Sequence, residues 1–321
     1  MNADIAEFDS AADFSEGLAA VKLPDRYAYL TAAGALAFQL DPELDGVSAF
    51  TEQRAVVRLS DLYGYIDQSG KIVVDPQFAT ANPYAQGLAV VQTGRGHGYL
   101  DRAGQLAIEP EFALAADFSE GLAAVKQDGR YGYLNLIGDW VVAAQFEDAW
   151  SFAESRAVVK AGEQWGYIEP SGKLAIAPQF DGAFSFSQGL ARVRQGDRWG
   201  FIDPTGRLTV APQFDFASDF AEGLAAVLVG QKWGYVDPAG KLVIAPQFDY
   251  AADFSAGLAA VKLGDRFGFV DSSGQIKIAP QFQNAGAFAG GWARVQMTEE
   301  AGGRWRYVNP SGEFLQLTKV S

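Results

Sequence analysis

The stretch GQKWGYVDPAGK, residues 230–241, decides how this chain folds. Its centre, Trp233–Val236, combines aromatic and β-branched residues, which favour a short half-buried strand. Gly234 weakens such a strand, so we expect another backbone or an aromatic ring to lie close to its bare Cα. Asp237–Gly240 has the residue order of a tight turn, because Asp accepts local hydrogen bonds, Pro presets φ and Gly takes a positive φ. With the flanking runs Leu224–Leu228 and Lys241–Ile244, the stretch predicts a three-stranded antiparallel meander.

Copies of this pattern account for essentially the whole chain. The spacing between copies is 34 residues from position 63 to position 267, with a first step of 36 and a last step of 38. The position of Trp233 is filled in the nine copies by Tyr27, Tyr63, His97, Tyr131, Trp165, Trp199, Trp233, Phe267 and Trp305. We therefore predict a single repeat domain over residues 1–321. Its repeats fall approximately at 8–41, 42–77, 78–111, 112–145, 146–179, 180–213, 214–247, 248–281 and 282–321.

The fold class predicted from these repeats is all-β. A period of 34 is also typical of tetratricopeptide helix pairs. Here, however, the apolar runs are four or five residues long and are bounded by turn signals, and no helical period is sustained.

Several repeat positions together resemble a known family. Lys232–Tyr235, Gln164–Tyr167 and Arg198–Phe201 share one motif, and Gly-Leu-Ala-x-Val, Asp-x-x-Gly and Pro-Gln-Phe positions keep register with it. The pattern is similar to that of the WG-repeat (KWG-repeat) proteins of bacteria over almost the full length. That resemblance implies an all-β repeat protein that mediates interactions. The signature residues are Trp165, Gly166, Trp199, Gly200, Trp233 and Gly234.

Two arrangements of nine small sheets fit the sequence. A lone three-stranded sheet cannot bury its faces, so each repeat must pack on its neighbours. Each connection carries two aromatic residues, such as Phe248 and Phe254, which we expect to plug the gap between sheets from a turn or a single helical turn. We predict an open superhelical, solenoid-like array, because the sequence shows no extra strand that could join the last repeat to the first and close a ring. The alternative is a closed propeller-like toroid, in which nine three-stranded blades would be unusual.

Composition limits the partners and the compartment. The net charge is −14 and the pI about 4.5, which disfavours nucleic acid and anionic membrane surfaces and favours basic protein partners. There is no cysteine, and no apolar run is long enough to span a bilayer. The first residues, MNADIAEF, have neither the basic nor the apolar part of a signal peptide, so we expect a cytoplasmic protein. The sequence predicts no oligomeric state.

Acidic residues recur at fixed places in the connections. Stacked repeats would align them into an acidic face for a basic partner or for weakly held Ca²⁺, whereas the plainer interpretation is a solvated surface with local capping. No carboxylate run matches a calcium loop, so we predict no metal and no cofactor. The residues of this tentative acidic face are Asp13, Glu16, Asp117, Glu120, Asp219, Glu222 and Asp253.

Other chemically capable residues have structural interpretations. His97, the only histidine, takes the place of Trp233 in its repeat, which argues against a catalytic triad or a histidine metal site. Trp165, Trp199 and Trp233 would make an aromatic ladder for sugars if exposed, but such a position is more typical of a core. The tryptophans outside that position, Trp140, Trp150 and Trp292, are candidates for a local role. The hairpin acids are predicted turn formers: Asp67, Asp101, Asp203, Asp237 and Asp271.

These patterns favour binding over catalysis. The sequence shows no nucleophile beside a base and no cluster of metal ligands. Repeats offer long regular surfaces, so we predict a non-catalytic scaffold for protein–protein interaction and no enzyme activity. The alternative is a carbohydrate- or small-ligand-binding repeat protein, which exposed tryptophans at the repeat position would favour.

Overall fold

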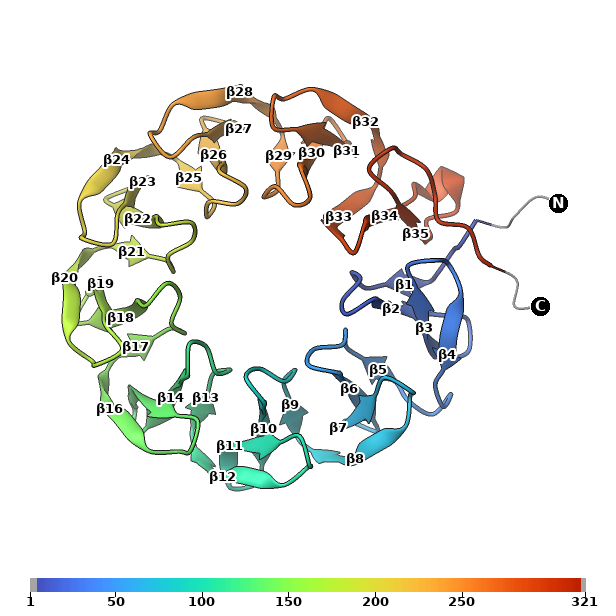
Figure 1. Cartoon of the computed structure of the whole chain (residues 1–321). Helices are drawn as coiled ribbons and strands as arrows, with labels where there is room; N and C mark the ends of the chain where they lie inside the picture. The colour runs from blue at the N-terminus through green and yellow to red at the C-terminus, as the bar shows by residue number, and fades with distance from the viewer. Residues whose placement is uncertain (1–4, 319–321) are drawn as a thin grey trace. The chain divides into compact units, whose positions relative to one another are not determined.

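The computed structural model describes residues 5–318, so the first four residues of the MNADIAEF segment lie outside it. In this range the chain is all-β, as predicted, and forms nine antiparallel sheets and one short 3₁₀ helix (Figure 1). It divides into two compact units. Unit 1 holds the described residues up to Gln77, with Gln231–Gly234 and the residues from Val243 onward; unit 2 holds Phe78–Gly230 and Tyr235–Leu242.

The strands of unit 1 belong to the first two and the last two repeats. The first sheet contains β1 (Ser10–Ala11), β2 (Leu18–Lys22), β3 (Tyr27–Thr31) and β4 (Leu36–Gln39). The second contains β5 (Gly46–Val47), β6 (Arg54–Leu59), β7 (Leu62–Asp67) and β8 (Ile72–Phe78). The eighth contains β29 (Tyr250–Ala251), β30 (Leu258–Leu263), β31 (Arg266–Asp271) and β32 (Ile276–Phe282). The ninth contains β33 (Asn284–Ala289), β34 (Trp292–Gln296) and β35 (Trp305–Val308), with the 3₁₀ helix at Glu299–Ala301.

The strands of unit 2 repeat the same order. The third sheet contains β9 (Thr80–Ala81), β10 (Leu88–Thr93), β11 (Gly96–Asp101) and β12 (Leu106–Phe112). The fourth contains β13 (Leu114–Ala115), β14 (Leu122–Gln127), β15 (Arg130–Asn135) and β16 (Trp140–Phe146). The fifth contains β17 (Asp148–Ala149), β18 (Ala157–Ala161), β19 (Gln164–Ile168) and β20 (Leu174–Phe180), and the sixth contains β21 (Gly182–Ala183), β22 (Ala191–Gln195), β23 (Arg198–Ile202) and β24 (Leu208–Phe214). The division between the units passes through the seventh sheet, which contains β25 (Phe216–Ala217), β26 (Ala225–Val229), β27 (Lys232–Val236) and β28 (Leu242–Phe248).

Eight of the nine described sheets have four strands, so the prediction of three was one strand short. The extra strand lies in the connection, where a turn or a helical turn was expected. In unit 2, β13 pairs with β14 through Leu114 opposite Lys126 and Ala115 opposite Val125. Glu120 and Gly121 then form the hairpin turn with φ of 53° and 81°, as a two-residue type I′ turn requires. A two-residue strand is too short to show an alternating pattern, which is why the sequence did not reveal it.

The glycine of the repeat motif is explained by close approach of a backbone, as predicted. A Cβ built on Gly166 would lie 2.6 Å from the carbonyl oxygen of Ile176 and 2.7 Å from the nitrogen of Pro178. The register explains this approach, because Trp165 faces Phe180 while Tyr167 already faces Ile176, so that β20 bulges towards β19.

Among the largest fully buried side chains is the tyrosine two residues after the tryptophan. Tyr167 is fully buried, and its hydroxyl donates a hydrogen bond of 2.8 Å to the carbonyl oxygen of Phe184 in the next repeat. Burial raises the pKa of Tyr167, so the phenol stays neutral. By contrast, Trp199 is 9% exposed, and Trp165 and Trp233 are only partly buried. The tyrosine position therefore joins neighbouring repeats, and the tryptophan position lies nearer the surface.

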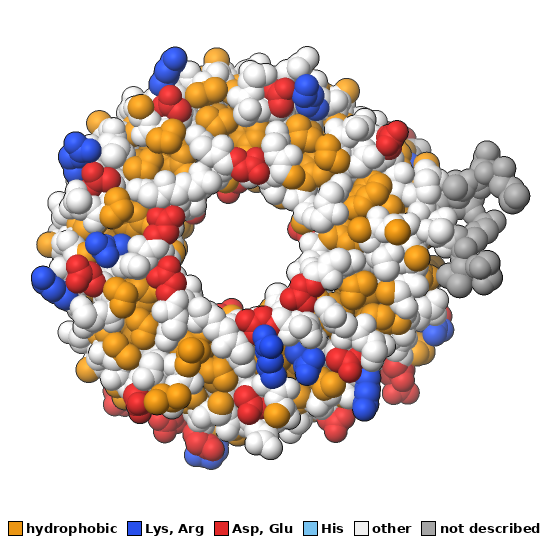
Figure 2. Space-filling model, viewed as in Figure 1, with side chains coloured by type: hydrophobic (Ala, Val, Ile, Leu, Met, Phe, Trp, Pro, Cys, Tyr) orange, Lys and Arg blue, Asp and Glu red, His pale blue; other side chains and the backbone are white. Residues whose placement is uncertain are grey.

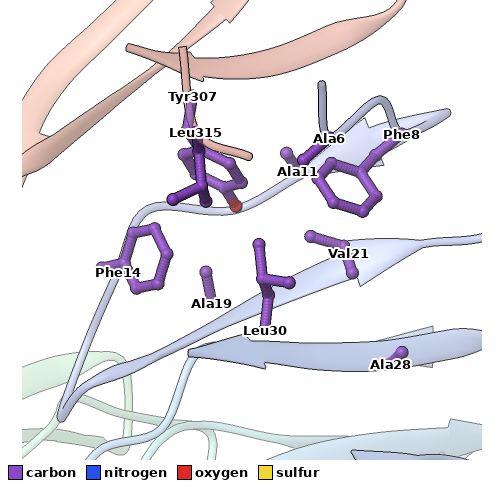
Figure 3. Packing of buried hydrophobic residues seen from close by; sticks show 10 residues of the cluster. All are labelled: Ala6, Phe8, Ala11, Phe14, Ala19, Val21, Ala28, Leu30, Tyr307 and Leu315. Atoms are coloured by element: carbon purple, nitrogen blue, oxygen red, sulfur yellow. The ribbon is translucent and has the colours of Figure 1, made fainter. Parts of the chain in front are cut away.

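In unit 1 the last repeat meets the first through the contact that joins successive repeats. The Tyr307 hydroxyl donates to the carbonyl oxygen of Ala12 at 2.6 Å, as that of Tyr29 does to Ser48 between repeats 1 and 2. Figure 3 shows Tyr307 and Leu315 packed among side chains of the first repeat, including Phe14.

The predicted open array is therefore wrong, and the fold is the propeller-like alternative. The two terminal segments make the contacts that join the last repeat to the first, which we call the latch and which the sequence did not reveal. Phe8 and Trp305 exchange backbone hydrogen bonds of 3.0 and 2.9 Å, and the Ala6 nitrogen donates to the carbonyl oxygen of Leu315 at 3.1 Å. Single bridges of this kind have no sequence pattern of their own.

Candidate functional site

The glutamates of the tentative acidic face lie in the hairpin turns, and Glu16 and Glu120 bind the next repeat. Oε2 of Glu120 accepts a hydrogen bond of 2.8 Å from the backbone nitrogen of Ser155, and Oε2 of Glu16 accepts one of 2.9 Å from Gln53. Gln188 makes the same contact with Gly223 through its amide oxygen at 2.8 Å. Because glutamine and glutamate serve equally, this contact needs an oxygen acceptor and not a negative charge.

Three of the aspartates also have partners in neighbouring repeats. Oδ1 of Asp219 lies 2.8 Å from Nε of Arg192, and Oδ1 of Asp13 lies 2.8 Å from Nε of Arg294. Asp117 accepts a hydrogen bond of 2.9 Å from the Asn82 amide. These acids therefore stabilise junctions between repeats.

The acidic face stays a prediction, with Asp253 and Glu222 among its exposed members. On the face seen in Figure 2, acidic side chains over the sheets β17–β20 and β21–β24 lie among hydrophobic and basic ones and form no continuous acidic surface.

A band of aromatic side chains in unit 2 is the strongest candidate for a binding site. We call Trp150, Trp165, Phe184, Trp199 and Phe216 the aromatic band. Ring centroids are 6.1 Å apart for Trp150 and Trp165 and 4.9 Å apart for Trp150 and Phe184. Trp199 lies 5.6 Å from both Phe184 and Phe216, which extends the band over repeats 5 to 7.

Arg192 stabilises the centre of the aromatic band. Its guanidinium carbon lies 3.5 Å from the Phe184 ring centroid, 5.7 Å from that of Trp199 and 5.4 Å from that of Phe216. Its NH1 also donates to the carbonyl oxygen of Ala217 at 2.6 Å, and its side chain is only 11% exposed. A cation held in this way by ring faces, a carbonyl and the Asp219 carboxylate is fixed in position.

The orientation of the rings bears on which ligand the band suits. The ring plane of Trp150 is inclined by 76° to that of Trp165 and by 89° to that of Phe184. In both pairs the edge of one ring points at the face of the other. Arg192 covers one face of Phe184. A sugar stacks on an open ring face, whereas a protein side chain packs against edges and rims as well. The geometry therefore suits a protein surface better than a sugar ladder.

The sequence analysis found only part of this site. It singled out Trp150 as a departure from the repeat and named Trp165 and Trp199, but it missed Arg192, Phe184 and Phe216. The signal was present, because the other repeats have Ala, Val or, in repeat 9, Arg294 at the Arg192 position. A systematic comparison of each repeat position would have found these departures.

The remaining candidates have structural surroundings. Trp292 donates a hydrogen bond of 3.1 Å to the carbonyl oxygen of Ala32, which ties the last repeat to the first. Trp140 is 39% exposed and lies edge-on to Phe112. His97 is partly buried, and its buried Nδ1 has no hydrogen-bond partner among the described residues.

The hairpin aspartates are turn formers, as predicted. Oδ1 of Asp203 accepts hydrogen bonds from the backbone nitrogens of Thr205 and Arg207 at 3.0 and 3.1 Å. The Thr205 hydroxyl lowers the pKa of Asp203, and the Ser273 hydroxyl lowers that of Asp271 to about 2. Within residues 5–318, no group of three or more His, Asp or Glu side chains is placed to hold a metal ion, and no helix is long and apolar enough to cross a membrane.

The chain is similar to a family of repeats and to several solved structures. No curated protein matches the chain. The crystal structure of a eukaryotic initiation factor is 10% identical, with 86% of this chain and 88% of that one covered and a TM-score of 0.62, a likeness of fold alone. The WD40 domain of SCAP from fission yeast is 9% identical over 97% of each chain, with a TM-score of 0.47.

The family model of the WG containing repeat matches residues 6–27, 63–95, 98–131, 131–164, 165–199, 199–233, 233–266 and 267–299. With these matches covering most of its length, the chain belongs to the WG-repeat family.

Proposed function

We propose that this WG-repeat protein is a non-catalytic scaffold that holds a protein partner on the aromatic band of unit 2. The observation that supports the proposal is the departure of repeats 5 to 7 from the regular pattern. Where repeat 4 has Ala116 and Ala124, repeat 6 has Phe184 and Arg192. Tryptophan and arginine are the residues that most often dominate the binding energy of protein interfaces.

The exposure within the band supports the same function. Phe216 is 37% exposed and stands beside the buried Trp199, so a partner would cover an aromatic edge that is already held in place. A pre-ordered aromatic group loses little side-chain entropy on binding. The net charge of −14 favours a basic partner, because complementary charge speeds association.

The experiment compares two matched variants in partner capture. Phe216→Ala removes the exposed ring of the band, and Leu114→Ala removes an exposed side chain, 45% accessible, at the same repeat position in repeat 4. We expect wild type and Leu114→Ala to retain the same protein from a lysate of the source cells, and Phe216→Ala to lose it. Equal retention by both variants would contradict the proposal.

Carbohydrate binding is the second candidate, because Trp165 is only partly buried. A glycan array screened with the same two variants and with Trp165→Ala separates the two functions. Glycan binding that Phe216→Ala or Trp165→Ala abolishes would replace the protein-scaffold proposal.

A further inference from the structure

One outer strand of unit 2 differs in sequence from the outer strands of the other regular repeats. β16 is the last strand of the sheet β13–β14–β15–β16, so one side of its backbone faces away from that sheet. Its sequence is WVVAAQF, with Ala144 as the fifth residue. The outer strands of repeats 2, 3 and 5 to 8 all have proline at this position: Pro76, Pro110, Pro178, Pro212, Pro246 and Pro280.

Proline protects the edge of a sheet from pairing with another chain. It donates no backbone hydrogen bond, and its ring obstructs an approaching strand. Lysine and arginine beside an edge strand have a similar effect. Repeat 4 has Asp139 directly before its outer strand, so β16 has neither the proline nor the cation. The corresponding cations of repeats 2, 5, 6 and 7 are Lys71, Lys173, Arg207 and Lys241.

Repeat 4 also exposes large apolar side chains at this edge. In the turn before β16, Ile137 is 77% exposed and Leu136 is 41% exposed. The other repeats have alanine, serine or threonine at the position of Ile137. On β16 itself, Trp140 and Val141 are 39% and 42% exposed. Apolar side chains beside an unprotected strand edge favour association with another strand.

The outer strand of repeat 1 also lacks the proline, but it is short. β4 has four residues, and Leu40, at the position of Ala144, is 4% exposed. A short edge strand offers an approaching strand little to pair with. Among the outer strands that the structure describes in repeats 1 to 8, β16 is therefore the one that is both seven residues long and without proline.

The charges favour a second copy of this chain as the partner of β16. Two copies repel each other at a net charge of −14, so contact costs least where both surfaces are uncharged. β16 has no charged side chain, and thus offers nothing for a basic strand to recognise, whereas its own copy has the same open edge. In an antiparallel pair with Val142 at the two-fold axis, Trp140 of one copy faces Ala144 of the other, and Asp139 faces Gln145. This register brings a large ring opposite a small side chain and opposes no two acids.

We propose that β16 pairs antiparallel with β16 of a second copy, which joins two four-stranded sheets into one continuous sheet and forms a two-fold dimer. The assembly ends at two chains, because each copy uses its open edge once. Backbone hydrogen bonds between the two strands hold the dimer, and the exposed side chains beside them add apolar contact. The aromatic band takes no part, so this inference does not rest on the proposed function.

Ala144→Pro tests the dimer, because it restores the residue that six other repeats have at this position. Sedimentation velocity over about 1–200 µM covers the dissociation constants of modest interfaces. Wild type is expected to shift from monomer to dimer over this range, and Ala144→Pro to remain a monomer. The control Leu106→Ala, which removes a 41% exposed side chain from the proline-protected β12, is expected to dimerise as wild type does. A monomeric wild type, with or without the strand of another protein bound, would overturn the proposal, as would an Ala144→Pro protein that dimerises equally.

Cysteine crosslinking locates the contact without the proline variant. The chain has no cysteine, so a single one can be introduced by Ala143→Cys in β16 or by Ala177→Cys at the same position of β20. Both alanines are exposed. A short bismaleimide is expected to convert Ala143→Cys to a covalent dimer and to leave Ala177→Cys monomeric. Equal crosslinking of the two variants, or none from position 143, would contradict the assignment.

Discussion

Replacing Gly166 by alanine tests the reason for the glycine that defines the repeat motif. The new Cβ would lie 2.6 Å from the carbonyl oxygen of Ile176, where ordinary contact begins at 3.4 Å, and 2.7 Å from the nitrogen of Pro178. Both atoms belong to backbone, so no side-chain rotation relieves the clash. Either β20 must move away by several tenths of an ångström or the pairing of Tyr167 with Ile176 must break.

The expected destabilisation is about 2–4 kcal/mol, the upper range for overpacking and for disruption of a buried backbone. The matched control is Gly94→Ala, because Gly94 has a negative or extended φ and no atom within 4 Å of its built Cβ. That change is expected to stay within about 0.5 kcal/mol of wild type. Urea unfolding followed by tryptophan fluorescence and by circular dichroism measures both. A Gly166→Ala protein as stable as the Gly94→Ala protein would refute the argument from backbone approach.

Three further changes probe the junctions and the turns. Tyr307→Phe removes the hydroxyl that donates to the Ala12 carbonyl oxygen and joins the last repeat to the first. We expect the free energy of unfolding, measured by urea titration, to fall by about 1–2 kcal/mol. An unchanged urea midpoint would show that this hydrogen bond adds nothing to stability. Glu120→Gln is expected to be as stable as wild type, whereas Glu120→Ala loses the acceptor for the Ser155 nitrogen and has a lower melting temperature; equal losses in both would mean that the charge matters. The Asp271 pKa is lowered from 3.8 to about 2 by folding, so its contribution to stability is present above pH 4 and is lost as the pH falls towards 2. Melting temperatures over that window should fall less steeply in Asp271→Asn, and identical slopes would contradict this.

The sequence was sufficient for the repeat, for three strands of each repeat and for the reason for the motif glycine. These features depend on local chemistry, since a turn or a close backbone approach restricts the residues that can occupy it. Gly166 and Asp203 could therefore be interpreted from the sequence alone. The same holds for the second and third strands of each repeat, whose apolar runs are long enough to be recognised.

The features that sequence reasoning missed are those that involve two repeats at once. The short strand β13 is two residues long and has no period. The latch between Phe8 and Trp305 consists of single bridges between residues almost 300 positions apart in the chain. The acids of the predicted face were found, but not the partners Arg192 and Arg294 that hold two of them. Such contacts depend on the distance between repeats in space, which spacing along the chain does not give.

The central claim, that the aromatic band holds a protein partner, is tested most directly by photocrosslinking. Benzoylphenylalanine would replace Phe216 in one protein and Leu114, at the same position in repeat 4, in another. We predict that a partner protein is crosslinked from position 216 and not from position 114. A partner crosslinked from position 114 alone, or no protein crosslinked from position 216 in the cells of origin, would contradict the claim.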